Sequence, residues 1–202
     1  MGITSTILTE IGKWAATHWL LATWRRMTSH PIFYPNRAVL DRESPLADKM
    51  GEAERIDAIW LTGIKSLVEI EDVKKVDRLL LPDPNSKSLA YYQSTMKIEE
   101  RRDLGDEIRK ASKLARAKRI RVRWLKESIG YSLTIWNPRG DKARVIIEMT
   151  LPVVHGGNHP SFEFRKPKHS ETIDGVISMF DSLWGDEHSR EPQDSEFDYG
   201  AR

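Results

Sequence analysis

The sequence of 202 residues contains no cysteine. It therefore has no disulfide, no thiolate metal site and no cysteine nucleophile, which fits a reducing compartment. A strong charge of one sign is also missing, because the formal net charge is only +2. No field of the whole chain points to nucleic acid or to a membrane. Since 39% of the residues are hydrophobic and 31% are charged, we expect one medium-sized folded body with appendages.

Catalytic and cofactor motifs are scarce. The sequence contains no glycine-rich phosphate loop of either common type, and nothing marks a nucleophile elbow. His155 and His159 stand four residues apart, a spacing that suits a metal on a helix, but Gly156 and Gly157 between them favour a loop. The nearest further ligand would be His169, at the far end of a predicted strand. We therefore expect a solvated loop here, with no metal and no cofactor.

Only the first segment is strongly apolar. Residues 1–29 are predicted to form a helix with a wide apolar stripe, and three of the seven tryptophans fall in its first 24 residues. At helical pitch ~22 residues span roughly 33 Å, about the thickness of a bilayer core. The interrupting charges Glu10 and Lys13 argue against spanning. The candidate anchor or interface residues are Trp14, Trp19, Leu21 and Trp24.

Three interpretations of this helix stay open. It can dock on a protein partner or on a second copy of the chain, it can anchor the chain at a membrane, or it can pack on the chain's own domain. Trp24 beside Arg25 and Arg26 resembles an anchor at the cytoplasmic interface. The segment lacks the basic start and the cleavage site of a signal peptide. We therefore expect a cytoplasmic protein, with attachment to the inner face of the membrane as one alternative.

The rest of the chain alternates between strand and helix patterns, which predicts an α/β fold with a mixed sheet and flanking helices. We expect a linker at residues 30–40, a domain at 41–187 and an acidic, disordered tail at 188–202. The predicted elements are a helical stretch at 41–56, a buried strand at 57–63, a strand and loop at 76–86, a long helix at 88–118, a strand at 119–125, a hairpin at 132–150, a strand at 161–166 and a helix that starts with Ser170 as its cap.

Charge is distributed unevenly along the chain. Residues 97–126 contain twelve Lys and Arg against five acids, a local charge of +7, whereas residues 186–202 contain six acids against two Arg, a local charge of −4. The basic run predicts either an ordinary solvated helix face or a stripe that contacts phosphate groups of nucleic acid or anionic lipid. The candidate phosphate-binding residues are Arg109, Lys113, Arg116, Arg119, Arg121 and Arg123.

The order of the predicted elements, with Leu80-Leu81-Pro82-Asp83-Pro84 between a strand and a helix, resembles the phospholipase D-like superfamily. It is most similar to single-copy bacterial and archaeal members, over about residues 37–185. The resemblance implies a phosphodiester substrate and a His-x-Lys-x4-Asp motif on the hairpin. In active members the histidine forms a phospho-enzyme and the lysine stabilises charge on phosphate oxygens. Two such histidines are needed, from two half-domains or from a dimer.

The chain departs from this pattern at the hairpin. None of its six histidines is followed two residues later by lysine. Ser132 and Thr134 stand near the positions of the catalytic pair, and neither hydroxyl replaces an imidazole that is nucleophilic and basic near neutral pH. Asp141 lies near the position of the motif's acid, where a turn residue is commonly acidic. The resemblance therefore predicts a scaffold without the family's chemistry.

We expect a catalytically degenerate phospholipase D-like module that serves as a sensing, regulatory or assembly protein. It would bind a phosphate-bearing ligand or a protein partner, and relatives of this kind occur in prokaryotic stress and defence contexts. One alternative is a phosphodiesterase or nuclease with an unrecognised active site that depends on Ser132, Thr134 or His155. The other is a nucleic-acid-binding accessory protein, whose affinity would fall steeply with salt.

Overall fold

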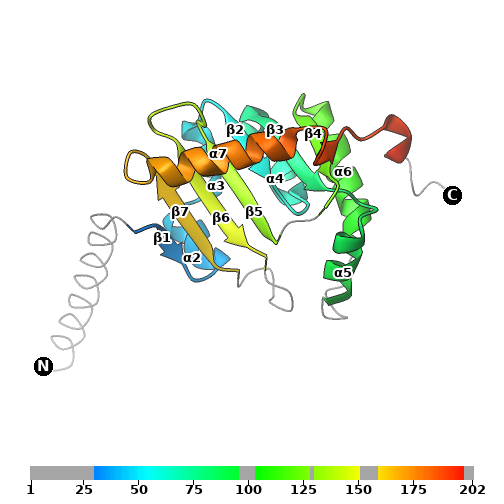
Figure 1. Cartoon of the computed structure of the whole chain (residues 1–202), viewed down its shortest axis with the longest axis horizontal. Coiled ribbons are helices and arrows are strands. Elements are labelled where there is room, and N and C mark those ends of the chain that lie inside the picture. The colour runs from blue at the N-terminus through cyan, green and yellow to red at the C-terminus, as the bar shows by residue number, and fades with distance from the viewer. Residues whose placement is uncertain (1–29, 96–102, 128–129, 151–158, 198–202) are drawn as a thin grey trace, which may run out of the picture. The chain divides into compact units, whose positions relative to one another are not determined.

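The computed structural model describes residues 30–95, 103–127, 130–150 and 159–197 (Figure 1). Almost all of these residues belong to one compact unit, Phe33–Arg202. The predicted apolar helix and its candidate residues Trp14, Trp19, Leu21 and Trp24 lie outside the described residues. No helix in the described ranges has the length and apolarity needed to cross a membrane.

A mixed sheet forms the centre of the unit, as the sequence predicts, and it has eight strands. Its strand order is β1-β7-β6-β5-β2-β3-β4-β8. β2, β3 and β4 are parallel, and β5, β6 and β7 form an antiparallel meander that joins the sheet at β2. The strands are β1 (Ile32–Tyr34), β2 (Ile56–Ile59), β3 (Val76–Pro82), β4 (Arg121–Leu125), β5 (Tyr131–Trp136), β6 (Arg144–Met149), β7 (Ser161–Arg165) and β8 (Ser189–Arg190).

Helices cover both faces of the sheet. α7 crosses one face, where Ile173 and Phe180 pack with strand residues such as Leu80 and Leu133 (Figure 1). α6 packs on the other face beside β3, β4 and α4. The helical elements are α2 (Arg37–Glu43), α3 (Leu46–Glu52), α4 (Ile64–Glu69), η1 (Glu71–Lys75), α5 (Lys87–Thr95), α6 (Leu104–Ala117), α7 (Ser170–Trp184) and η4 (Asp194–Glu196).

The prediction of one long helix at residues 88–118 is wrong, because this range contains two helices. α5 ends at Thr95 and α6 begins at Leu104. Asp103 has extended backbone angles, and its carboxylate accepts a hydrogen bond from Asp106 N at 2.9 Å, so it is the N-cap of a new helix. The periodic pattern does not predict this cap, because aspartate also occurs on the polar face of a helix. Similarly, the helical stretch predicted at residues 41–56 is two short helices, α2 and α3, followed by β2.

The predicted linker and the predicted disordered tail both contain regular structure. The linker expected at residues 30–40 contributes β1 to the sheet and the start of α2, where the side chain of Asn36 accepts from Val39 N at 3.0 Å. The tail expected to be disordered from residue 188 contains β8 and η4. Polar composition predicts disorder there, but hydrogen bonds from Arg123 to Ser189 and the ion pair of Arg190 with Asp83 hold these residues on the folded body. The closing helix has His169 as its N-cap, one residue before the predicted Ser170.

Candidate functional site

The hairpin of β5 and β6 presents its two predicted hydroxyls on one face of the sheet. Ser132 and Thr134 are two residues apart on β5 and therefore point to the same side. Thr134 is 7% exposed, and its Oγ1 accepts a hydrogen bond from the indole Nε1 of Trp60 at 3.1 Å. Ser132 is half-buried opposite Glu148, and Asp141 is exposed in the turn. The inner hydroxyl of the hairpin, that of Thr134, is thus bonded to a buried tryptophan.

A buried carboxylate lies in the same cross-strand row as Thr134. Ile146 pairs with Thr134 on one side and with Glu163 of β7 on the other. Glu163 is 0% exposed. Its oxygens accept hydrogen bonds from Tyr34 Oη at 2.6 Å, from Lys49 Nζ at 3.3 Å and from Arg165 Nε at 2.5 Å. Two further groups complete this cluster, the hydroxyl of Ser44 at 3.3 Å and the guanidinium of Arg144 at 3.3 Å.

Burial and charge act on the two central groups in opposite ways. Burial alone would raise the pKa of Glu163, but hydrogen bonding from Arg165 and attraction by Lys49 hold that pKa at about 2. Burial lowers the pKa of the Lys49 ammonium to about 8, because attraction by Glu163 offsets the loss of water only in part. Burial and the bond to Glu163 also raise the pKa of Tyr34. At neutral pH the cluster is an ion network that joins β1 to β7 and holds α3 against the sheet.

The six candidate phosphate-binding residues are divided between two layers. Arg109, Lys113 and Arg116 are on α6, and the exposed Arg119 follows it with a left-handed φ of 63°. Arg121 and Arg123 project from β4 toward the α7 side, where each guanidinium lies 5.9 Å from the ring of Trp184. The structure therefore does not bring the six together as one continuous stripe.

Four of these arginines have partners within the chain. Arg121 pairs with Asp77 of β3 at 2.7 Å, and Arg109 donates to the side-chain oxygen of Asn85 at 2.9 Å. The other two pairs go to the C-terminal segment, which we define as residues 186–197. In that segment the carboxylate of Asp194 contacts Arg116 at 2.8 Å, and the carboxylate of Asp186 contacts Arg123.

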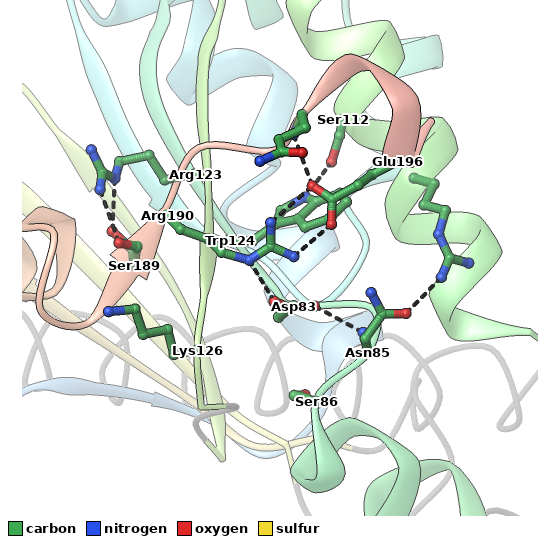
Figure 2. A network of polar contacts seen from close by, with 12 residues as sticks. Asp83, Asn85, Ser86, Ser112, Arg123, Trp124, Lys126, Ser189, Arg190 and Glu196 are labelled. Atoms are coloured by element: carbon green, nitrogen blue, oxygen red, sulfur yellow. Dashed lines mark hydrogen bonds and ion pairs between the residues drawn. The ribbon is translucent and has the colours of Figure 1, made fainter. Parts of the chain in front are cut away.

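The C-terminal segment is tied to the end of β3 and to β4 by a further polar network (Figure 2). Arg190 Nε donates to Asp83 at 2.9 Å, and both terminal nitrogens of Arg190 donate to Glu196 at 2.8 Å. Hydrogen bonding to Glu196 and then to Asp83 raises the pKa of Arg190. The guanidinium lies 4.9 Å from the ring of Trp124, whose indole nitrogen donates to Ser112 at 2.8 Å. The segment is thereby fixed along the outer edge of the sheet.

No family model matches this chain, and no curated protein is similar to it in sequence. Function therefore has to follow from the chain's own residues and contacts.

One of the two histidines of the predicted loop lies within the described residues. His155 lies outside the described residues. His159 is 5% exposed, which contradicts a solvated position, and its Nδ1 lies 4.0 Å from Glu148 Oε1. His169 is engaged elsewhere, because its Nδ1 accepts from Arg165 N at 3.1 Å. Among the residues described, no group of three His, Cys, Asp or Glu side chains is placed to hold a metal ion.

The sequence interpretation missed the groups that organise both sites. Arg190 falls in the predicted disordered tail, and no prediction singles out Lys49 or Glu163. A signal for the first was present in the opposite charges of residues 97–126 and 186–202, which are complementary in sign. No local signal marks Lys49, because its burial depends on a strand more than a hundred residues away in the sequence.

Proposed function

We propose that this chain is a non-catalytic module of phospholipase D-like type, which binds a phosphate-bearing ligand without cleaving it. The observation that carries the proposal is how the polar side chains of the hairpin are buried and bonded. Thr134, at the position of the family's lysine, is buried and bonded to Trp60, and the adjoining polar groups are bonded around Glu163. The lysine of active members stabilises charge on phosphate oxygens. A buried, uncharged threonine bonded to an indole cannot supply that stabilisation.

Support for the ligand class comes from Arg116 of α6 and Arg123 of β4, which both contact the C-terminal segment. Oxygen atoms of the C-terminal segment accept hydrogen bonds from both guanidinium groups, so their planes are already oriented. A planar guanidinium with fixed orientation matches phosphate oxygens in geometry and in charge. Less side-chain freedom is lost on binding when the donor is held in place beforehand.

Turnover tests the first half of the proposal. Full-length protein is incubated with bis(p-nitrophenyl) phosphate and with an oligonucleotide, with and without Mg²⁺ and Mn²⁺. We expect no product above the buffer control. Turnover that is lost in Ser132→Ala and retained in Ser66→Ala would overturn the proposal and establish a phosphodiesterase instead. Ser66 on α4 supplies the same chemical change away from the hairpin.

Binding tests the second half. Anisotropy of a labelled single-stranded oligonucleotide is measured for the wild type, for Arg116→Gln with Arg123→Gln, and for Arg42→Gln with Arg139→Gln. The last pair lies outside the C-terminal edge and removes the same charge. We expect the first pair to weaken binding by about tenfold or more, since each good charge-assisted contact is worth about 1 kcal/mol. Equal weakening in both pairs would show that net charge, and not this edge, binds the ligand.

A further inference from the structure

The arginines of the proposed site have two kinds of contact with the C-terminal segment. Arg123 donates from Nε to Ser189 Oγ at 2.8 Å and from Nη2 to the carbonyl of Ser189 at 2.9 Å. Arg116 donates from Nη2 to the carbonyl of Pro192. These oxygens are neutral. In addition, Arg123 and Arg116 each contact one carboxylate oxygen of Asp186 and Asp194, respectively.

The exposures show from which side each group approaches. The side chains of Arg123 and Arg116 are 12% and 34% exposed, whereas those of Asp186 and Asp194 are 94% and 97% exposed. The neutral oxygens therefore hold the guanidinium groups, and the carboxylates reach them from the solvent side. A carboxylate so exposed adds little to stability, because water and salt screen its attraction. It can leave the arginine while the backbone contacts stay in place.

We infer that Asp186 and Asp194 occupy the positions that two phosphate groups of a single-stranded nucleic acid take when it binds. This inference rests on the proposed function and adds the ligand class and its regulation. The backbone of residues 186–197 builds the site, and two carboxylates of the same residues compete with the ligand for it. Binding then begins with the two aspartates turning away into water.

Two features favour a nucleic acid over a lipid surface. The large apolar side chains exposed in the described residues are Phe33, Val68, Tyr91 and Met149, and none of them is on α6, β4 or the C-terminal segment. A protein that lies on a membrane inserts apolar side chains beside its basic ones, and this edge has none exposed to insert. The edge does carry arginine beside aromatic rings, with Phe197 at 4.7 Å from the Arg116 guanidinium, a combination typical of single-strand binding surfaces.

The decisive variant removes the competing charges and leaves the arginines intact. Asp186→Asn with Asp194→Asn is compared with Glu52→Gln with Glu54→Gln, which changes the net charge equally at exposed residues in and after α3. Affinity for a labelled single-stranded oligonucleotide is measured by anisotropy at about 50 mM and about 200 mM salt. We expect the aspartate pair to bind about three- to tenfold more tightly than wild type at the lower salt, and the glutamate pair less than about twofold.

The outcomes separate this inference from the function on which it rests. If both pairs tighten binding equally, the aspartates do not occupy the site; the inference falls and the phosphate-binding function stands. If no form binds the oligonucleotide and none binds phosphatidylserine vesicles, the proposed function falls as well. Binding to the vesicles alone would overturn the choice of nucleic acid. Hydrogen exchange of residues 189–196 should be unchanged in the aspartate pair, and loss of protection there would show that the carboxylates hold the segment and do not merely compete.

Discussion

Protonation of the buried Glu163 should set the acid limit of this fold. The carboxylate is 0% exposed and has five side-chain partners, of which Lys49, Arg144 and Arg165 are basic. Replacing the carboxylate with an amide of nearly the same size, Glu163→Gln, removes the charge and keeps the volume. The change therefore isolates the electrostatic contribution of Glu163 to the free energy of unfolding.

The magnitude follows from the shift of its pKa. The pKa of Glu163 falls from the ordinary 4.5 to about 2, and at about 1.4 kcal/mol per pKa unit this corresponds to about 3 kcal/mol of folding free energy. Because no part of the residue is exposed, solvent screening does not reduce this figure much. Removal of one partner from a buried ion pair costs roughly 3–5 kcal/mol in other proteins, which is the same range.

The dependence on pH has a definite sign. Since the folded-state pKa of Glu163 lies below the unfolded value of 4.5, the stabilisation is complete above that pH and is lost as the pH falls toward 2. Urea unfolding, followed by tryptophan fluorescence at a series of pH values, gives the free energy of unfolding of wild type and variant. We expect Glu163→Gln to be about 3 kcal/mol less stable at neutral pH, with the gap closing in acid.

Parallel curves for wild type and Glu163→Gln across the acid range would refute this reasoning. Glu171→Gln on the exposed first turn of α7 is the control, and its curve should stay close to that of wild type. If Glu163→Gln does not fold, the double variant with Lys49→Met keeps the test open, because it also removes the ammonium left without a carboxylate. Its stability should then no longer show the acid-sensitive loss of about 3 kcal/mol.

Three further substitutions test local features of the fold. Gly63→Ala should destabilise the protein by roughly 1–3 kcal/mol in urea unfolding, because Gly63 has a φ of 66° and an added Cβ would collide with the ring of Trp60. Trp60→Phe should cost about 1–3 kcal/mol in the same assay, since the hydroxyl of Thr134 loses its buried donor; no change would mean that this hydrogen bond is not formed. Arg190→Gln should release the C-terminal segment, seen as faster hydrogen exchange at residues 189–196 with the sheet unaffected, and unchanged exchange would contradict the role given to its ion pairs.

Short-range patterns predicted most of the sheet. The strand expected at residues 119–125 is β4, and the hairpin expected at 132–150 is β5 and β6, because alternating apolar residues report directly which face of a strand is buried. The same patterns do not predict a helix boundary that a single polar group decides. Asp103 ends one helical pattern and starts another through one hydrogen bond to a backbone amide.

The candidate sites were less predictable because they depend on contacts between distant residues. Arg190 meets Asp83 across 107 positions, and nothing near either residue signals that contact. The sequence predicts a strand at residues 161–166, in which a charged residue would ordinarily be exposed. Glu163 is instead fully buried, because α3 and β1 bring Lys49 and Tyr34 over that face. A charged residue is buried where distant partners offset its charge, and the sequence around it does not reveal those partners.

The shortness of β8 has a consequence for how this protein behaves at high concentration. β8 pairs with Trp124 and Leu125, two of the five residues of β4. A strand edge without a neighbour is a template on which other chains can add as strands. The guanidinium group of Arg121, which is 58% exposed, stands beside the remainder of that edge in the described residues and opposes such stacking by charge and by bulk. A neutral substitution of Arg121 should therefore increase aggregation, even where the monomer keeps its fold.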